Sequence, residues 1–278
     1  MYLNHLQQDE IFIPSAIKSF ESITGIKSRR GLENVIVSNG KIVNVVSKRY
    51  GHIPNELFFN KAQDLLNQTR LVYQKQTINR DNRSFVMDFI IENNNLFELK
   101  NKQDQILPML RFKNSYDGSE KTSGHFGFFR QICSNGLHIA QSKITFSIRH
   151  TKNSTNLIMP ELEWLFEKFM DNEFYSISNQ FLQMSAASIN DEEAFVFEVL
   201  NRIKLFQYAC SAKNNNPSKK ARMVLDTLNK ESICLGVSPN LWLGYNAFNR
   251  VLHTQLKKGF SQQEKLDKAL FEAIYAMV

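Results

Sequence analysis

Eleven residues of this sequence have side chains or backbone conformations suited to binding phosphate, and most lie where predicted strands or turns end. They are Lys48, Arg49, Tyr50, Ser115, Asp117, Gly118, Ser119, Arg130, Asn135, Arg149 and His150. A planar guanidinium group can donate two parallel hydrogen bonds to one phosphate. A glycine-containing turn can direct backbone N–H groups at an anion. These residue types therefore indicate binding to a phosphate-rich polyanion.

Each part of this set also has a purely structural interpretation. We expect the four cations to contact phosphates and Tyr50 to stack on an unpaired base. Alternatively, Asp117 and Gly118 only form a tight hairpin turn, in which the carboxylate accepts backbone N–H groups of its own loop. In the same interpretation Arg130 forms a buried ion pair with Asp117, and His150 is a structural hydrogen-bonding residue.

Three phenylalanines, Phe126, Phe128 and Phe129, stand directly before Arg130. Aromatic side chains beside a cation are typical of strands on which unpaired bases stack. The chain contains 22 Phe, however, so core packing is the expected role of two of the three. Alternation along a strand places Phe128 and Phe129 on opposite faces.

Familiar catalytic motifs are missing from the sequence. It contains no Gly-x-x-x-x-Gly-Lys phosphate loop, no Gly-x-Ser-x-Gly elbow and no His-Glu-x-x-His helix. Two enzymatic alternatives remain: a thiolate–imidazole pair of Cys133 with His138 or His150, and a metal-dependent nuclease using Asp88, Glu92 and Asp117. We expect a non-catalytic protein without a cofactor or a bound metal.

The positive charge is concentrated in the first half of the chain. The formal net charge is +7; residues 1–150 contain 20 Lys and Arg against 13 Asp and Glu, and residues 151–278 contain 14 against 14. A localised excess of this sign attracts polyanions through counterion release. The alternative is a lysine-rich surface that serves only solubility.

Hydropathy and cysteine usage indicate a cytoplasmic protein. No apolar run approaches the roughly 18 residues needed to cross a bilayer, and residues 1–10 lack the pattern of a secretion signal. The three cysteines, Cys133, Cys210 and Cys234, are odd in number and widely spaced. We expect them to be reduced and mostly buried.

The pattern of apolar residues predicts an α+β fold: an N-terminal antiparallel sheet with a crossing helix, followed by an all-helical C-terminal half. Asn39-Gly40 lies between two β-rich runs and predicts a tight hairpin. A helix should follow over residues 54–69, with further strands at 70–76, 83–92, 106–114, 125–132 and 143–149. We place a basic mixed region at 1–152 and a helical region at 153–278, packed as one compact unit.

Two helix starts are predicted in the second half. Ser218 follows the polar stretch 214–217, which should be a loop between helices, and is placed to cap the next helix. Ser261-Gln-Gln-Glu264 has the spacing of a capping box and should begin the last helix.

Several of these segments together resemble an uncharacterised phage/plasmid-like family, domain of unknown function 932. The likeness rests on Ser115-Tyr-Asp-Gly-Ser119, Arg130-Gln-Ile-Cys-Ser-Asn135 and Arg149-His-Thr151, flanked by Val45-Val-Ser-Lys-Arg-Tyr50 with Asn55 and by Trp242 with Asn246-Ala247. The sequence departs from the family pattern at Tyr116, where His is usual, and at Gly136. The resemblance implies a mobile-element protein, often associated with recombination.

The sequence therefore favours a nucleic-acid-binding protein, expected to bind or anneal single-stranded DNA as a homo-oligomer. Annealing proteins of the Rad52 kind also combine a hairpin, a crossing helix and antiparallel strands, which is an analogy of architecture. The alternatives are a mobile-element protein that inhibits a host defence component, and the metal-dependent nuclease. No membrane partner is expected.

Overall fold

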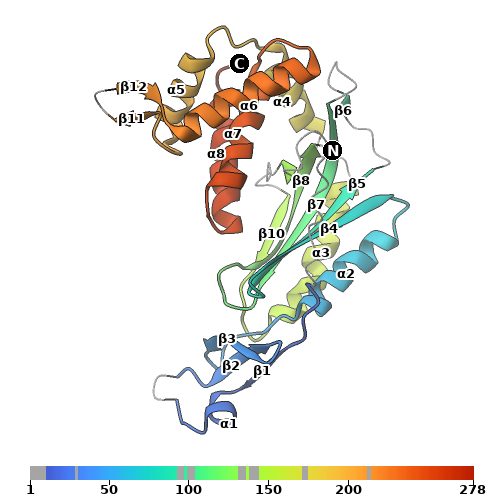
Figure 1. The fold of residues 1–278 in the computed structure, drawn as a ribbon. Helices are drawn as coiled ribbons and strands as arrows, with labels where there is room; N and C mark the ends of the chain where they lie inside the picture. The colour runs from blue at the N-terminus through green and yellow to red at the C-terminus, as the bar shows by residue number, and fades with distance from the viewer. Residues whose placement is uncertain are drawn as a thin grey trace. The chain divides into compact units, whose positions relative to one another are not determined.

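The computed structural model describes residues 11–28, 31–92, 97–98, 104–130, 136–137, 144–170, 175–211 and 214–278 (Figure 1). Its strands are β1 (Ser15–Ser19), β2 (Asn34–Ser38), β3 (Lys41–Val46), β4 (Tyr73–Arg80), β5 (Ser84–Ile91), β6 (Phe97–Glu98), β7 (Gln105–Ser115), β8 (Thr122–Arg130), β9 (Gly136–Leu137), β10 (Thr145–Ile148), β11 (Ala209–Ser211) and β12 (Asn214–Pro217). Its helices are α1 (Phe20–Thr24), α2 (Asn55–Asn67), α3 (Ser154–Met170), α4 (Tyr175–Ala186), α5 (Glu192–Ile203), α6 (Lys219–Leu235), α7 (Leu241–Gln255) and α8 (Phe260–Tyr275). The fold is α+β, as predicted.

The strands form one large sheet and two small ones. The large sheet has the order β10-β8-β7-β5-β4, with β6 added beside β7 and β9 beside β8. A separate sheet has the order β1-β2-β3, and β11 pairs with β12. The strand β5 is buried along its whole length because β4 and β7 flank it on both sides. It is therefore an interior strand of the large sheet.

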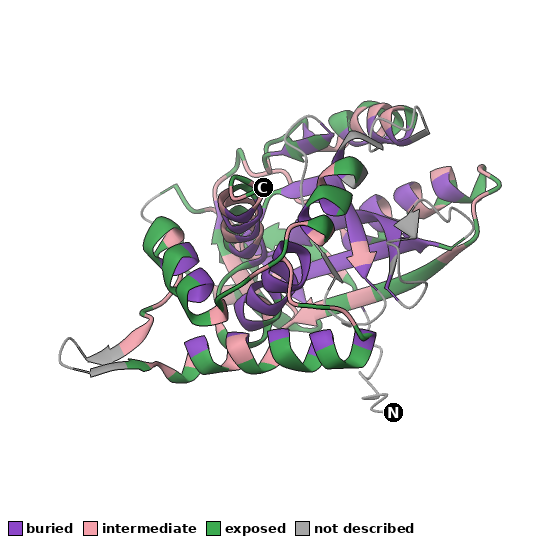
Figure 2. Cartoon of the chain, turned by 90° about the horizontal axis from the view of Figure 1, so that it is seen from above, coloured by how far each residue is buried: buried purple, intermediate pink, exposed green. Residues whose placement is uncertain are grey.

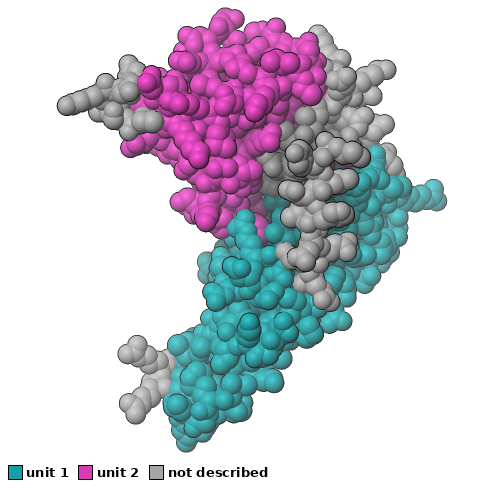
Figure 3. Space-filling model, viewed as in Figure 1, with its two compact units in different colours: residues 1–94, 109–126, 141–171 teal, residues 95–108, 127–140, 172–278 magenta. Residues whose placement is uncertain are grey.

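The chain divides into two compact units (Figure 3). Unit 1 contains residues 1–94, 109–126 and 141–171, and unit 2 contains residues 95–108, 127–140 and 172–278. This differs from the expected division at residue 152, because α3 belongs to unit 1 and the outer ends of β7 and β8 belong to unit 2. The chain therefore passes between the units within single strands.

Aromatic side chains fill the core of unit 1. On the face that carries Phe112, the sheet receives Phe58 from α2 at a ring distance of 5.9 Å and Phe166 from α3 at 6.2 Å. Gly124 on β8 leaves room for this layer, since an added β-carbon would lie 2.5 Å from the ring of Phe146. The two helices thus pack buried residues, among them Phe58 and Phe166, on one face of the sheet. Figure 2 shows helices of the chain with buried positions along one side and exposed positions along the other.

Unit 2 has a separate aromatic core built mainly from α4, α7 and α8. The ring of Phe181 lies 5.0 Å from Phe128 and 4.8 Å from Trp242, and Tyr245 packs edge-on against Phe271. Core packing is therefore the role of Phe128, as it is of Phe126 in unit 1.

The structure confirms several local predictions. Asn39 and Gly40 both have positive φ, 49° and 72°, and turn β2 into β3. The helix expected over 54–69 is α2, and the Ser218 hydroxyl accepts a hydrogen bond from the N–H of Ala221 at 3.3 Å, so Ser218 caps α6.

Other local predictions are wrong. β1 and α1 precede the hairpin and were not predicted, because most residues of β1 are exposed and show no apolar alternation. β11 and β12 form a two-stranded ribbon where a loop was expected, so the second half is not all helix. The last helix begins at Phe260 with Gly259 as its N-cap, which leaves Ser261 inside the first turn instead of at the cap.

Two further expectations concern the cysteines and membranes. Cys234 is exposed and not buried, because it lies on the outer side of α6, whereas Cys133 lies outside the described residues. No helix in the described part of the chain is both long enough and apolar enough to cross a bilayer.

Candidate functional site

Three segments that are distant in the sequence meet in unit 1 around Tyr50 and His150. The two rings are stacked, with centroids 5.1 Å apart and planes inclined by 2°. The backbone at Gly51 lies directly against Thr151: a β-carbon there would be 1.8 Å from the Thr151 carbonyl oxygen. Only glycine permits this approach, so Gly51 allows the segment after β3 to lie against the segment after β10.

A buried hydrogen-bond network joins these segments to β7 and β8. The Asn114 amide donates to the side-chain oxygen of Asn55 at 2.9 Å and to the Ile53 carbonyl at 2.8 Å. Thr122 donates to the Asn114 side-chain oxygen at 2.8 Å, and its hydroxyl lies 3.5 Å from Nε2 of His150. Both asparagines are fully buried. The sequence motifs assigned no role to Asn114 or Thr122, although Asn114 directly precedes the Ser115–Ser119 motif.

Tyr116, which stands where the resembled family usually has His, is a buried part of this network. Its hydroxyl accepts the backbone N–H of Asn55 at 3.0 Å, and its ring meets His52 edge-on at 5.1 Å. His52 in turn lies 2.9 Å from the Ser15 hydroxyl through Nε2. The phenol therefore joins β7 to the start of α2.

The turn that joins β7 and β8 is held by its own side chains. Ser115 Oγ donates to the Glu120 carbonyl at 2.7 Å and accepts the Glu120 N–H at 3.1 Å. Asp117 accepts the N–H of Ser119 at 2.9 Å, and Gly118 has a φ of 78°. The structural interpretation of this turn thus holds, and the N–H groups of Ser119 and Glu120 are already used. Asp117 and the exposed Ser119 hydroxyl remain available at its surface.

Burial sets the protonation of the aromatic and imidazole groups here. It raises the pKa of Tyr50, with a smaller contribution from the negative charge of Asp117. Burial also lowers the pKa of His52 to about 4, helped by the neighbouring His150. The pKa of His150 falls for the same main reason, opposed by the nearby carbonyls of Gly51 and Glu120. At neutral pH all three rings are uncharged hydrogen-bonding groups.

Three buried polar atoms in this cluster lack a partner among the described residues. They are the Tyr50 hydroxyl oxygen, Nδ1 of His52 and Nδ1 of His150. Buried polar groups without a hydrogen bond are uncommon in folded proteins. The cluster can therefore hydrogen-bond a ligand without breaking an existing bond at these three atoms.

Exposed cations stand on the three segments that meet at the Tyr50–His150 pair. Five stand within two residues of Tyr50, Thr122 or His150: Lys48, Arg49, Lys121, Arg149 and Lys152. In the described part of the chain Lys48 is the one member of the five with an ion pair, a 3.9 Å contact to Glu33 that leaves its side chain 72% exposed. We call these five residues the basic rim. Acids also lie at the cluster: the partly exposed Asp117, the buried Glu120 and the exposed Glu56, whose charge acts on Tyr116.

Comparison with known proteins identifies the family. A profile described as "Domain of unknown function (DUF932)" matches residues 42–269. The chain belongs to the DUF932 family. A search of curated proteins and one of solved structures found no match. The DUF932 match includes all three segments that meet at Tyr50 and His150.

Arg130, by contrast, does not belong to this site. It lies in unit 2 with no exposed surface, donating to both oxygens of Asp104 at 2.6 and 2.8 Å and to Glu231 at 2.6 Å. Its guanidinium also lies 5.6 Å from the ring of Trp242. The expectations that Arg130 contacts phosphate or pairs with Asp117 are therefore wrong, because two other carboxylates occupy its donors. Asn135 lies outside the described residues.

Of the two enzymatic alternatives, only the metal-dependent nuclease falls on residues that the structure describes. On a buried part of the sheet, both carboxylate oxygens of Asp88 accept hydrogen bonds from Arg111, at 2.7 and 2.6 Å. No group of three or more metal-binding side chains assembles among the residues that the structure describes. Cys133 and His138 lie outside them.

Proposed function

We propose that this DUF932 protein binds nucleic acid, with single-stranded DNA favoured, at the surface formed by Tyr50, His150 and the basic rim. The observation that supports the proposal is the set of exposed cations on the three segments that meet at the neutral Tyr50–His150 pair. Arg49 and Arg149 each directly precede one of the two stacked rings, so their backbones lie close together. Both can then contact neighbouring phosphates of one strand.

The preference for single strands is supported by the buried, unpartnered polar atoms of the cluster. Unpaired bases expose the edges that a duplex hides, and proteins read those edges with side-chain donors and acceptors. The Tyr50 hydroxyl and Nδ1 of His52 can serve as such groups. One face of the Tyr50 ring is already stacked on His150, so the role that we assign to Tyr50 changes from base stacking to hydrogen bonding.

The wider biological setting is part of the same proposal. We infer a phage- or plasmid-associated protein that acts in the cytoplasm without catalysis and assembles into a homo-oligomer, with strand annealing as the activity. An oligomer would place several copies of the basic rim along one strand. Cooperative binding along the strand, typical of single-strand binding proteins, would follow.

The proposal is tested by titrating labelled single- and double-stranded oligonucleotides with the full-length protein at low and moderate salt, with and without Mg²⁺. Tighter binding of the single strand, weakened by salt and without cleavage, supports it. Shortened products on a gel would require an enzyme. Absence of binding at low salt would contradict the proposal and leave the host-protein inhibitor as the alternative to pursue by affinity capture.

A further inference from the structure

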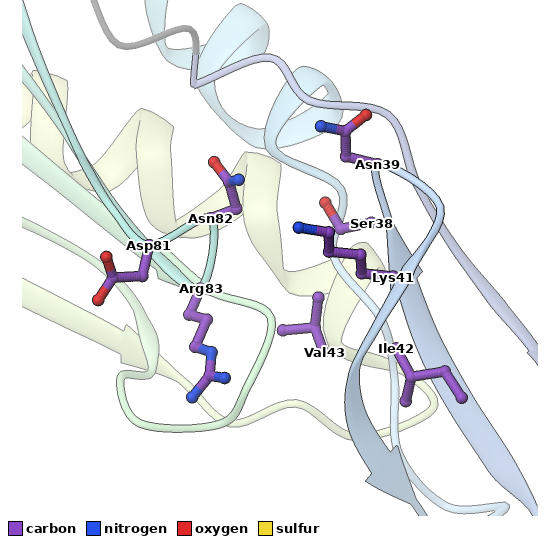
Figure 4. A pocket seen from close by; sticks show the side chains of 8 residues that line it. All are labelled: Ser38, Asn39, Lys41, Ile42, Val43, Asp81, Asn82 and Arg83. Carbon is purple, nitrogen blue, oxygen red and sulfur yellow. The ribbon is translucent and has the colours of Figure 1, made fainter.

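Two hairpin turns of unit 1 enclose a cavity of about 360 Å³ (Figure 4). One turn joins β2 to β3 at Asn39-Gly40, and the other joins β4 to β5 at Asp81-Asn82, where both residues also have positive φ. The lining consists of Ser38, Asn39, Lys41, Ile42, Val43, Asp81, Asn82 and Arg83. We call this cavity the hairpin pocket. It is separate from the Tyr50–His150 cluster.

A buried hydroxyl in the hairpin pocket lacks a hydrogen-bond partner. Ser38 is 2% exposed, and its Oγ makes no hydrogen bond within the described residues. Most buried hydroxyl groups in folded proteins are hydrogen-bonded, so an unpartnered one that lines a cavity is a candidate ligand-binding group. Ser38 pairs with Lys41 across the β2–β3 hairpin, and Figure 4 shows both side chains among those that line the pocket. The two side chains therefore come from directly opposite positions of one hairpin.

The charges of the pocket favour an anion. Lys41 and Arg83 are exposed cations, and neither makes an ion pair within the described part of the chain. In Figure 4 the carboxylate of Asp81 and the guanidinium of Arg83 both point away from Ser38 and Lys41. The side-chain oxygen of Asn82 accepts a hydrogen bond from Asn79 at 2.7 Å, which leaves the Asn82 amide N–H groups for another acceptor. The pocket therefore offers donors of several kinds and little competing negative charge.

We propose that the hairpin pocket binds a phosphate group through Ser38 and Lys41, with the exposed Arg83 side chain, which must turn toward the ligand, as a further donor. A hydroxyl, an ammonium and a guanidinium are side chains that proteins use to hold phosphate oxygens. The cavity exceeds the volume of one phosphate, which leaves room for part of an attached nucleoside. That the phosphate belongs to nucleic acid rests on the proposed function.

The position of the pocket supports a continuous path to the candidate surface. The Arg83 carbonyl accepts the N–H of Tyr116 at 2.7 Å, and Ser84 pairs with Ser115 across β5 and β7. The pocket thus adjoins the β7–β8 turn, whose Asp117 lies close enough to Tyr50 to raise its pKa. A single strand can pass from the pocket over this turn to the basic rim.

Three proteins test the inference: Ser38→Ala, the double variant Lys41→Gln with Arg83→Gln, and the control Lys18→Gln with Lys27→Gln. The control removes the same charge from exposed sites on unit 1 outside the pocket. Each is measured for thermal stabilisation by inorganic phosphate at constant ionic strength. Each is also titrated with one single-stranded oligonucleotide carrying either a 5′-phosphate or a 5′-hydroxyl.

We expect phosphate to stabilise the wild type and the control, and both pocket variants to lose this response. Oligonucleotide affinity should fall about tenfold in the double variant, as expected for loss of charge-assisted hydrogen bonds. Loss confined to the 5′-phosphorylated strand identifies a terminal phosphate, and equal loss with both strands identifies an internal phosphodiester.

The outcomes separate this inference from the proposed function. In one outcome, the pocket variants bind oligonucleotides as tightly as the wild type, and inorganic phosphate stabilises none of the proteins. This result would overturn the pocket assignment and leave the proposed function intact. A response to inorganic phosphate that depends on Ser38, without any DNA binding by the wild type, would support the pocket and contradict the proposed function.

Discussion

Replacing Arg49 and Arg149 together by glutamine should selectively reduce the salt dependence of single-strand binding. Both side chains are exposed, so their loss leaves the core unchanged. They flank the stacked Tyr50–His150 pair, which places them at the centre of the basic rim. Each phosphate that a protein cation neutralises on single-stranded DNA contributes about −0.7 to the slope of log K against log salt.

The magnitude follows from the five cations of the basic rim. If all five contact phosphates, the wild-type slope is about −3.5, and loss of two arginines changes it to about −2.1. At about 0.1 M salt the difference of 1.4 in slope corresponds to a roughly 25-fold loss of affinity, or about 2 kcal/mol. The whole change in slope should be caused by the loss of Arg49 and Arg149.

Fluorescence anisotropy with a labelled oligonucleotide, repeated over a range of KCl concentrations, measures both slopes. The variant Lys18→Gln with Lys27→Gln is the matched control, because it changes net charge equally on the same unit. Circular dichroism verifies that all proteins remain folded. An unchanged slope in the arginine variant, or an equal change in the control, would refute the assignment of the basic rim. Net positive charge alone would then explain the salt dependence of binding.

Three further predictions concern stability and pH. Glu231→Ala should lower the free energy of unfolding by about 3 kcal/mol in urea denaturation, because it leaves the fully buried Arg130 without one of its two carboxylates; a loss below about 1 kcal/mol would contradict this. Gly51→Ala should cost at least about 2 kcal/mol and weaken oligonucleotide binding, since its β-carbon would meet the Thr151 carbonyl at 1.8 Å; wild-type binding and stability would show that the segments need not touch. Because the pKa of His52 falls from 6.5 to about 4 on folding, its contribution to stability is fully present above pH 6.5 and is lost as the pH falls towards 4. Its size is about 1–2 kcal/mol after allowance for partial exposure, and His52→Phe should reduce the decline in melting temperature over this range.

Features that depend on a few neighbouring residues could be predicted from the sequence. The hairpin at Asn39-Gly40 follows from the need for positive φ at both positions, and α2 follows from apolar residues that recur at helical spacing. The cap at Ser218 is equally local. The capping-box motif at Ser261 failed because Gly259, two residues earlier, takes the N-cap position instead. Such local signals predict that a helix is present, but two nearby candidate caps can leave its first residue undecided.

The candidate site was only partly predictable. The residues of the Ser115–Ser119 and Arg149–Thr151 motifs could be selected from the sequence. The structure brings both motifs to Tyr50, which stacks on His150 and is influenced by the charge of Asp117. Asn114 and Thr122 could not be recognised as the link between them, because both are ordinary strand residues until their partners are known. The same holds for Ser38, whose significance depends on a cavity completed by a second hairpin.

The sequence by itself determined the α+β class, the main strands and helices, and the concentration of positive charge in the first half. Only the tertiary structure decided which of those charges reach solvent. Arg130 has the same predicted chemistry as Arg149, but packing brings it to carboxylates 26 and 101 positions away in the chain. Contacts at such separations depend on which parts of the folded chain pack together. A pattern of a few neighbouring residues therefore cannot predict them.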